Sequence, residues 1–294
     1  MIEADRPQLR NHVEMLACTI GERNIWKYPA LQRAAEYIEQ QLGASRYVTT
    51  RQTYDVSRLP VSNIEAVLEG TSASEQIVVI GAHYDTVNGC PGANDNGTGI
   101  AAVLELARRF AGRPQARTIR FVAFVNEEPP FFQTPQMGSF VYAKRAQQCG
   151  DRIVAMLSLE TIGYYSDEQG SQEYPAAIAA LYPDVGNFIG FVANLESGPL
   201  VRTARAAFER RATLPVQDLI GPADVPGVGW SDQWSFWEAG YPAMMVTDTA
   251  PFRYPWYHTA EDTPDKIDYA RFASVVDGLE SVSAALAGAD FNAD

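Results

Sequence analysis

Side chains that bind divalent metals recur at four places along the 294-residue chain, each close to the end of an apolar run. Two of the three histidines belong to this set: His83 in Gly-Ala-His-Tyr-Asp and His258 in Tyr-His-Thr. Between them lie Asp95, in an Asn- and Gly-rich segment, and the acidic pair Glu127-Glu128. Imidazoles and carboxylates are ligands for zinc and similar ions, and this set is large enough for more than one ion. The sequence therefore predicts a metal site.

His83 and Asp85 are two positions apart in a segment predicted to be extended, so their side chains point the same way. His83 can then bind a metal while Asp85 accepts a hydrogen bond from the other ring nitrogen and fixes the tautomer. Asp95 precedes a predicted helix, whose positive N-terminus favours a carboxylate that is free to bridge two cations. The alternatives are a buried histidine paired with a neighbouring carboxylate, and an ordinary Asn-Gly turn with a helix cap.

The adjacent glutamates Glu127 and Glu128 directly follow a predicted strand. Two adjacent side chains cannot approach the same atom with the same geometry. One carboxylate is therefore expected to bind metal and the other to take a proton from water. His258 can complete a second set of metal ligands, and Tyr257 beside it can donate a hydrogen bond to a developing oxyanion. An exposed acidic strand end is the alternative for the glutamate pair.

Apolar periodicity indicates which elements position these residues. It predicts a helical region at about 8–42 and helices at 99–110, 138–148, 199–211 and 269–287. Apolar or alternating runs predict strands at 47–54, 62–69, 76–82, 118–125, 153–162, 187–194 and 243–247. Strands that alternate with helices predict an α/β three-layer sandwich with a mixed, largely parallel central sheet flanked by helices. Ligands bind beyond the carboxyl ends of such strands, where His83, Glu127-Glu128 and Glu160 are expected to meet.

The chain contains no internal repeat, low-complexity tract or clear linker. We therefore interpret residues 1–294 as a single catalytic domain with an N-terminal helix and loop insertions around the site. Segments 129–136, 164–183 and 249–257 are long and rich in proline and aromatic residues, and we expect them to rim a pocket.

The bulk composition excludes some partners. A formal net charge of −13 argues against nucleic acid and against anionic membranes. Cys18, Cys90 and Cys149 form no CxxC motif and are odd in number, which disfavours a disulfide framework and indicates a reducing cytoplasm. The N-terminal residues lack the basic and apolar regions of a secretory signal, which agrees with a cytoplasmic location. Secretion is the alternative if a signal peptide has been removed.

The order of the motifs resembles the M28 family of zinc aminopeptidases from His83 to the C-terminus. The motifs are GAHYD at 81–85, GANDNGTG at 92–99, the pair at 127–128, LETIGY at 159–164 and YHTAEDT at 257–263. The resemblance implies two Zn²⁺ per chain, although other divalent metals suit the same ligands. It assigns one ion to His83, Asp95 and Glu160 and the other to Asp95, Glu128 and His258, with Asp95 as the bridge.

The resemblance also implies roles for two further residues. Glu127 would be the general base that activates water, and Tyr257 or a zinc ion would stabilise the oxyanion. The implied substrate is a peptide with a free N-terminus, whose α-amine has three acidic candidate partners: Glu261, Asp262 and Asp232.

The chain departs from the family pattern at three places. Glu160 stands where the family typically has Asp, one methylene shorter, and we expect it still to bind metal. Gln233 stands where relatives often carry a histidine near the pocket, so a contact with substrate is expected to differ. Pro-Pro-Phe-Phe at 129–132 is expected to stiffen its loop and to narrow or line the specificity pocket.

These observations leave three hypotheses. The leading one is a dinuclear zinc aminopeptidase. The second is a glutaminyl cyclase-like enzyme that uses a single zinc, and the third is a non-catalytic binding module on the same fold. The full set of ligands, which includes His83 and Glu160, favours the peptidase.

Overall fold

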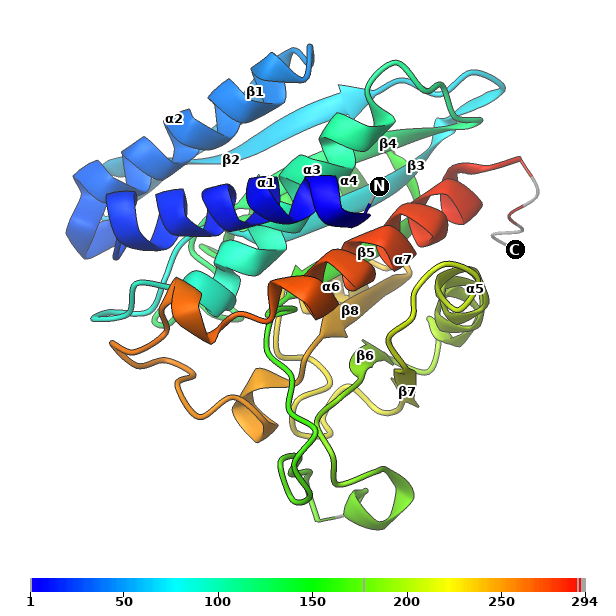
Figure 1. Cartoon of the computed structure of the whole chain (residues 1–294). Helices are drawn as coiled ribbons and strands as arrows, with labels where there is room; N and C mark the ends of the chain where they lie inside the picture. Colours follow the sequence, from blue (N-terminus) through cyan, green and yellow to red (C-terminus); the bar gives the residue numbers. More distant parts are fainter. Residues whose placement is uncertain (1, 177, 290, 292–294) are drawn as a thin grey trace.

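The computed structural model describes residues 2–176, 178–289 and 291. At its centre lies an eight-stranded sheet with the strand order β1-β2-β4-β3-β5-β8-β6-β7 (Figure 1). In chain order the strands are β1 (Thr49–Val56), β2 (Leu59–Leu68), β3 (Ala73–His83), β4 (Arg117–Phe124), β5 (Arg152–Glu160), β6 (Ile189–Ala193), β7 (Val216–Ile220) and β8 (Ala243–Thr247).

The sheet is mixed and mostly parallel. β3 pairs in parallel with β4 and β5, β5 with β8, and β6 with β7, whereas β1/β2, β2/β4 and β6/β8 are antiparallel. The central strands β5 and β8, and β3 from residue 77 onward, are almost continuously buried, which explains why their sequences are apolar on both faces. The prediction of an α/β fold with a mixed, largely parallel sheet is confirmed.

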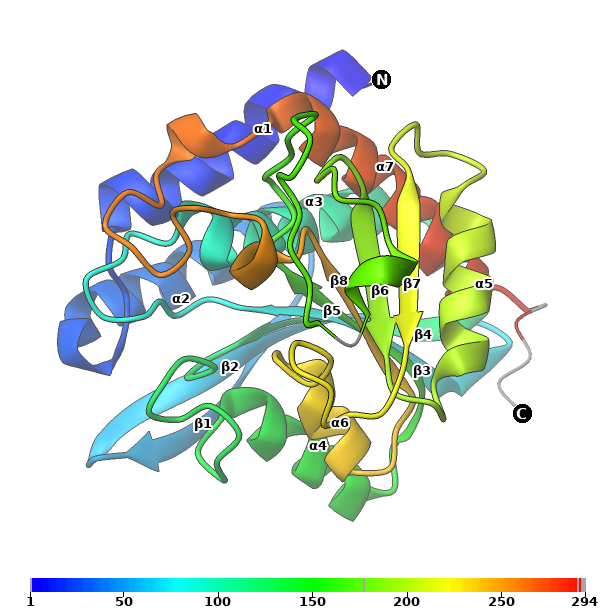
Figure 2. The ribbon, with the colours of Figure 1, turned by 90° about the horizontal axis from the view of Figure 1, so that it is seen from below.

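Helices cover both faces of the sheet (Figure 2). One face carries α1 (Ile2–Glu14), α2 (Tyr28–Ala44), α3 (Gly99–Phe110) and α7 (Tyr269–Ala287), with α5 (Gly198–Phe208) packed against α7. The other face carries α4 (Gly138–Cys149) and α6 (Gln233–Glu238). Each helix layer has its own apolar core: Leu31, Ile100 and Phe272 belong to the larger one, and Tyr142 and Phe236 to the smaller one.

The prediction of a helical region at 8–42 is confirmed for 8–20 and 25–42, but the chain is not helical at 21–24. After α1 a π-helical turn spans Met15–Ile20 and ends at Gly21, whose φ of 78° lies in the region that favours glycine. Asn24 then starts a new turn, because its side chain accepts hydrogen bonds from the amides of the two residues at 26 and 27. α2 begins as a separate helix at Tyr28.

Two short elements were not predicted, namely β7 and α6. They contain five and six residues, too few for a clear periodic pattern. The three cysteines are free, as their number and spacing predict. Within the described residues, no helix combines the length and apolar character needed to cross a membrane.

Candidate metal centre

Three neighbouring strands bring imidazole and carboxylate groups to the carboxyl edge of the sheet. His83 is the last residue of β3 and Glu160 the last residue of β5, and these strands pair in parallel. Glu127 and Glu128 follow β4, the other parallel neighbour of β3. The residues therefore converge on one edge, as the alternation of strands and helices predicts.

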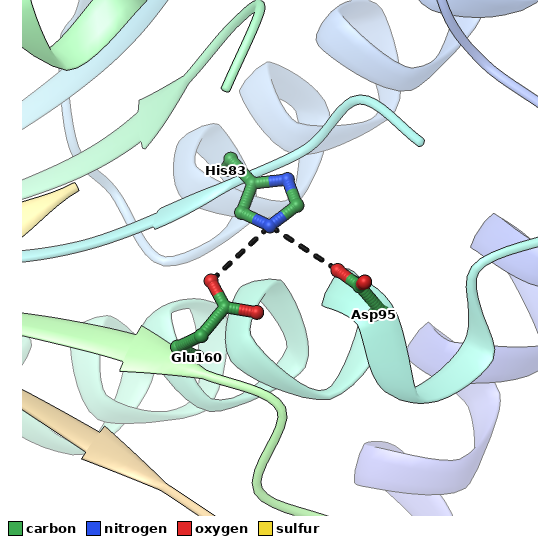
Figure 3. Close-up of side chains that lie close together, drawn as sticks. All are labelled: His83, Asp95 and Glu160. Atoms are coloured by element: carbon green, nitrogen blue, oxygen red, sulfur yellow. Dashed lines mark ion pairs between the residues drawn. The ribbon is translucent and has the colours of Figure 1, made fainter. Parts of the chain in front are cut away.

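His83 faces two carboxylates (Figure 3). Its Nε2 atom lies 3.3 Å from Oδ1 of Asp95 and 3.2 Å from Oε2 of Glu160. Asp95 is placed by the turn Ala93–Thr98, which leads directly into α3. All three side chains are buried, and their potential ligand atoms lie within 4.8 Å of one another. This group can surround a single metal ion.

A second histidine approaches the other oxygen of Asp95. The Nε2 atom of His258 lies 3.0 Å from Oδ2 of Asp95 and 3.4 Å from Oε2 of Glu128. Asp95, Glu128 and His258 form a second group of potential ligands within 4.8 Å of one another. Asp95 thus turns one oxygen toward each histidine, which is the arrangement that a bridging carboxylate requires.

Two buried atoms of the cluster make no hydrogen bond within the described part of the chain: Oδ1 of Asp95 and Nε2 of His258. Buried polar atoms are nearly always hydrogen-bonded, so an exception needs an explanation such as a bound ion. Groups of histidine and carboxylate ligands suit zinc and related divalent ions. The residues present therefore fit a metal centre with ligands for two ions.

The charges of the cluster shift the pKa values of its members. Burial lowers the pKa of His83, but the carboxylates of Glu160 and Glu127 outweigh burial and raise it well above its usual value. Burial also lowers the pKa of His258, but the nearby Asp95 carboxylate outweighs burial and raises this pKa to about 9. Burial raises the pKa of Asp95, but the two histidines outweigh it and hold the pKa below its usual range. Asp95 therefore stays ionised.

Glu127 and Glu128 are both buried, so the alternative of an exposed acidic strand end is wrong. Glu128 approaches His258, whereas Oε2 of Glu127 lies 3.9 Å from Nε2 of His83. Burial raises the pKa of Glu127 well above its usual value. A carboxyl group with a raised pKa can accept and return a proton near neutral pH.

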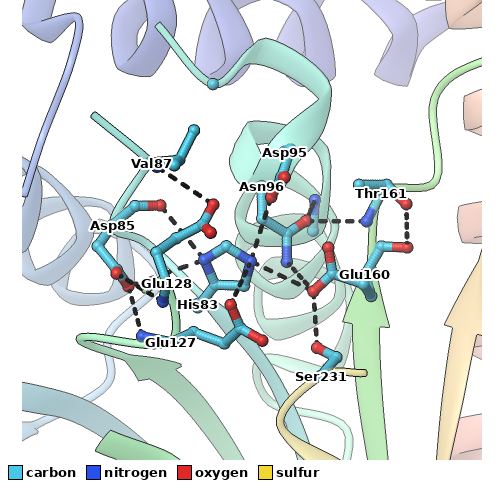
Figure 4. A network of polar contacts seen from close by, with 12 residues as sticks. His83, Asp85, Val87, Asp95, Asn96, Glu127, Glu128, Glu160, Thr161 and Ser231 are labelled. Atoms are coloured by element: carbon cyan, nitrogen blue, oxygen red, sulfur yellow. Dashed lines mark hydrogen bonds and ion pairs between the residues drawn. The ribbon is translucent and has the colours of Figure 1, made fainter. Parts of the chain in front are cut away.

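Asp85 acts differently from the prediction. The Nδ1 atom of His83 lies 3.2 Å from the backbone carbonyl oxygen of Asp85, whereas the carboxylate is 3.7 Å away. The carboxylate instead accepts hydrogen bonds from the backbone amides of Glu127 at 3.1 Å and Glu128 at 3.2 Å (Figure 4). The carbonyl can accept only from a protonated Nδ1, which leaves Nε2 free for a metal. Asp85 therefore orients the histidine through its backbone and the glutamate pair through its side chain.

Glu160 turns toward His83 despite its extra methylene, and two residues that sequence reasoning missed support it. Ser231 donates a hydrogen bond to Oε2 of Glu160 at 2.6 Å. Asn96 donates to the same oxygen at 3.4 Å and to the backbone carbonyl of Leu159 at 2.8 Å. Serine and asparagine are common in loops, so no local pattern marks these two.

The Asp95 segment is held by a buried carboxylate, that of Asp262. It accepts hydrogen bonds from the backbone amides of Asn94 at 2.8 Å and Asp95 at 3.1 Å, and from the hydroxyl of Tyr254 at 2.8 Å. Asp262 is fully buried and does not line the apolar pocket described below. The buried Asp232 and the exposed Glu261 do not line the apolar pocket described below.

Arg23, which sequence reasoning also missed, clamps the segment between His83 and Asp95. Its side chain is fully buried and donates to the backbone carbonyls of Tyr84 at 2.7 Å, Pro91 at 2.7 Å and Gly92 at 3.0 Å. Burial lowers its pKa to about 10, so the guanidinium is still charged at neutral pH. A positive charge therefore lies against the backbone of the segment that connects the candidate ligands His83 and Asp95.

A mostly apolar pocket adjoins the cluster at Glu160 and Tyr257. Its other walls come from segments 172–192, 217–230 and 245–252, so the expectation that 164–183 and 249–257 rim a pocket is confirmed. The ring of Tyr257 stacks on that of His258 with 3.8 Å between centroids. Burial raises the pKa of the Tyr257 hydroxyl well above its usual value, so this group keeps its proton.

Two expectations about the pocket are wrong. Segment 129–136 does not contribute to it, because Phe131 packs into the main core and Phe132 lies away from the pocket walls. Gln233 is fully buried in α6, where its side-chain amide donates to the carbonyl of Val228 at 2.9 Å, and it does not line the pocket. The positions of segment 129–136 and of Gln233 depend on how α4 and α6 pack, which the local sequence does not reveal.

Fold and site together define an α/β protein with a candidate metal centre at the carboxyl edge of its sheet. The model of peptidase family M28 matches residues 63–282. The uncharacterized protein YfbL of Escherichia coli (strain K12) is 36% identical over 285 residues, which are 94% of this chain and 87% of YfbL. The chain belongs to peptidase family M28.

Other similar proteins are more distant. A probable leucine aminopeptidase of Arthroderma otae is 28% identical over 222 residues, and the match covers 71% of this chain but about half (53%) of that protein. The structure of BSAP, a zinc aminopeptidase from Bacillus subtilis, matches with a TM-score of 0.77 and 16% identity, covering 98% of this chain and 97% of that chain. A glutaminyl cyclase from Fimbriiglobus ruber matches with a TM-score of 0.68 and 19% identity, covering 96% and 95%. At such identities these structures show a shared fold.

Proposed function

We propose that this M28 chain is a zinc-dependent aminopeptidase that removes N-terminal residues from peptides. The observation that carries the proposal is the orientation of Asp95, which turns one carboxylate oxygen toward His83 and the other toward His258. The buried Glu127 lies beside His83. We also propose that the chain forms one catalytic domain, since all eight strands belong to one sheet. The cytoplasmic location stays a prediction.

Two groups of residues would hold the metal ions. In this proposal His83, Asp95 and Glu160 hold one Zn²⁺, and Asp95, Glu128 and His258 hold the other. Zinc supplies Lewis acidity, which lowers the pKa of water and polarises a peptide carbonyl.

The chain's own residues would move the proton and stabilise charge. Glu127 accepts the proton of the attacking water and returns it to the leaving amine, a role that its burial and raised pKa support. Tyr257 keeps its hydroxyl proton and borders both His258 and the pocket. It can therefore donate a hydrogen bond to the carbonyl oxygen as negative charge develops there.

The pocket supports recognition of the amine end of a peptide. None of the described residues that line it is a lysine or arginine, so it offers no cation for a C-terminal carboxylate. Its walls include Phe188, Val192, Met245 and Phe252. We propose that it receives a large apolar side chain of the N-terminal residue.

The test is mass spectrometry of a mixed pool of short peptides incubated with zinc-loaded protein and with a chelator-treated control. Stepwise loss of N-terminal residues only with zinc supports the aminopeptidase. Glu127→Gln should abolish this loss while zinc content is unchanged, because neither of the two proposed ligand sets contains Glu127. Glu75→Gln is the matched control, since Glu75 is an exposed glutamate near the start of β3, at the end of that strand opposite His83, and should retain activity. An active Glu127→Gln variant would remove Glu127 as the base.

A glutaminyl cyclase-like activity is the second candidate. Two observations favour it: the similarity to the fold of the Fimbriiglobus ruber glutaminyl cyclase, and the group Asp95, Glu128 and His258, which could hold a single zinc. The same experiment separates the two, because a cyclase would release only ammonia from peptides that begin with Gln. No change in any peptide would favour a non-catalytic binding module.

A further inference from the structure

Three segments that are distant in sequence line the apolar pocket: 172–192, 217–230 and 245–252. The first and the last of these form the two walls that Arg253 contacts. One wall includes Gln172 and Phe188, and the other includes Thr249 and Phe252. The described residues of the first segment have little regular structure between β5 and β6: one short 3₁₀ turn, Ala179–Leu181, and an isolated bridge from Gln169 to Val185. The backbone joins the two walls at two places: the amide of Glu173 donates to the carbonyl of Phe252 at 2.8 Å, and β6 pairs with β8. Side-chain contacts must hold the rest of the irregular segment in place.

Arg253 connects them. It directly follows Phe252 and is 6% exposed, but it does not itself line the pocket. Its Nε donates to Oε1 of Gln172 at 2.7 Å, and one terminal nitrogen donates to the carbonyl of Phe188 at 2.7 Å. Its guanidinium also covers the ring of Phe188, 4.4 Å from the centroid. One buried side chain thus fixes two residues of the opposite wall.

Two further contacts restrict the positions of Gln172 and Arg253. Oε1 of Gln172 also accepts a hydrogen bond from the hydroxyl of Thr249 at 3.0 Å, so it joins both walls. The chain passes so close to Arg253 at Gly186 that a Cβ atom there would lie 2.9 Å from the arginine side chain. Only a glycine fits at this distance without displacing the arginine.

The metal-side end of the same segment is anchored by a different residue. Asp248 accepts hydrogen bonds from the side chain of Asn94 at 2.9 Å and from the amides of Gly163 at 3.1 Å and Tyr164 at 2.8 Å. Asn94 directly precedes Asp95. When Arg253 is replaced, Asp248 keeps these three hydrogen bonds, but it loses a nearby positive charge unless the replacement is lysine. Arg253→Lys therefore loosens the pocket wall while the metal-side end keeps both its hydrogen bonds and this charge.

We propose that Arg253 is a positioning residue that determines specificity, because it sets the width of the pocket that receives the side chain of the N-terminal residue. This inference rests on the proposed function for the identity of the ligand. A loosened wall would make fewer contacts with a large apolar side chain, whereas a small side chain such as alanine hardly uses the pocket.

The experiment compares zinc-loaded wild-type protein with Arg253→Met and Arg253→Lys, using peptides that begin with Phe or Ala. We expect the ratio of kcat/KM for Phe over Ala to fall about tenfold in Arg253→Met, mainly through KM of the Phe peptide. Activity on the Ala peptide should change less than about twofold. Arg253→Lys keeps the charge but has fewer donors, so its ratio should be intermediate.

Arg117→Met is the matched control. Arg117 is also buried and bonds backbone carbonyls, those of Leu286, Gly288 and Phe291, at the end of the sheet opposite the pocket. It should keep the wild-type ratio. An equal loss of activity on both peptides, or an unchanged ratio, in the Arg253 variants would overturn the proposal. If Arg253→Met does not fold, the ratio in Arg253→Lys decides in the same way.

Failure of the proposed function would give a different result. If the wild-type protein hydrolyses no peptide, calorimetry with free L-phenylalanine and L-alanine tests the pocket alone. Tighter binding of phenylalanine to wild-type protein that is lost in the Arg253 variant supports the role of Arg253. Equal binding of both amino acids, or a preference that the variant retains, overturns it.

Discussion

Arg23→Met is expected to weaken both the fold and the metal site, because Arg23 holds the chain between two predicted ligands. The residues that it clamps, Tyr84 to Gly92, lie between His83 and Asp95. Methionine fills a similar volume but has no donor. The substitution therefore removes the hydrogen bonds and the positive charge without leaving a large cavity.

The magnitude follows from the acceptors that lose their partner. Each buried carbonyl left without a donor costs about 1–3 kcal/mol, and those of Tyr84 and Pro91 accept the shortest bonds, both 2.7 Å. Removing a buried charge offsets part of this cost. We expect the free energy of unfolding of the metal-free protein to fall by about 3 kcal/mol. Zinc affinity should fall about 10–100-fold, as is usual when a residue that orients metal ligands is lost.

Two assays measure these effects: urea unfolding of the metal-free protein, and competition for zinc against a fluorescent chelator. Arg117→Met, which also removes a buried arginine bonded to carbonyls, should lower stability but leave zinc affinity unchanged. Arg23→Lys keeps the charge and should lie between the wild type and Arg23→Met. Unchanged zinc affinity in Arg23→Met would refute the argument that Arg23 positions the metal-binding segment.

Three further predictions concern the metal ligands and their surroundings. Asp95→Ala should lose both zinc ions, measured by atomic emission on the dialysed protein, because Asp95 belongs to both groups; full zinc content would dismiss the bridging role. Ser231→Ala should lower the affinity for one of the two zinc ions about tenfold, since Ser231 donates a hydrogen bond to Glu160. A zinc titration in which both sites keep their wild-type affinity would contradict this. Zinc affinity should rise with pH toward about 9, because in the metal-free protein His258 has a pKa raised to about 9 and zinc must displace that proton. The rise should approach tenfold per pH unit for one displaced proton, and equal affinities at pH 6 and pH 8 would exclude this coupling.

The sequence alone predicted most of the elements and the residue types of the site. α3, α7 and β8 have the predicted bounds, because their apolar patterns are long or continuous and end at clear breaks. The rule that ligands gather beyond the carboxyl ends of parallel strands indicated why His83, Glu127-Glu128 and Glu160 should meet. Motif order added Asp95 and His258, which no local pattern connects to the strand ends.

Only the tertiary structure decided what supports and surrounds these residues. Ser231 lies 71 positions from Glu160, Asp262 lies 167 from Asp95, and Arg23 lies 61 from Tyr84, so nothing local marks their contacts. The pocket likewise depends on β8 lying between β5 and β6, which brings segments 172–192 and 245–252 together. Local sequence determines period, turns and ligand chemistry, whereas strand order and the burial of single polar groups depend on long-range packing. For that reason the cluster of candidate metal ligands could be predicted, and the residues that position it could not.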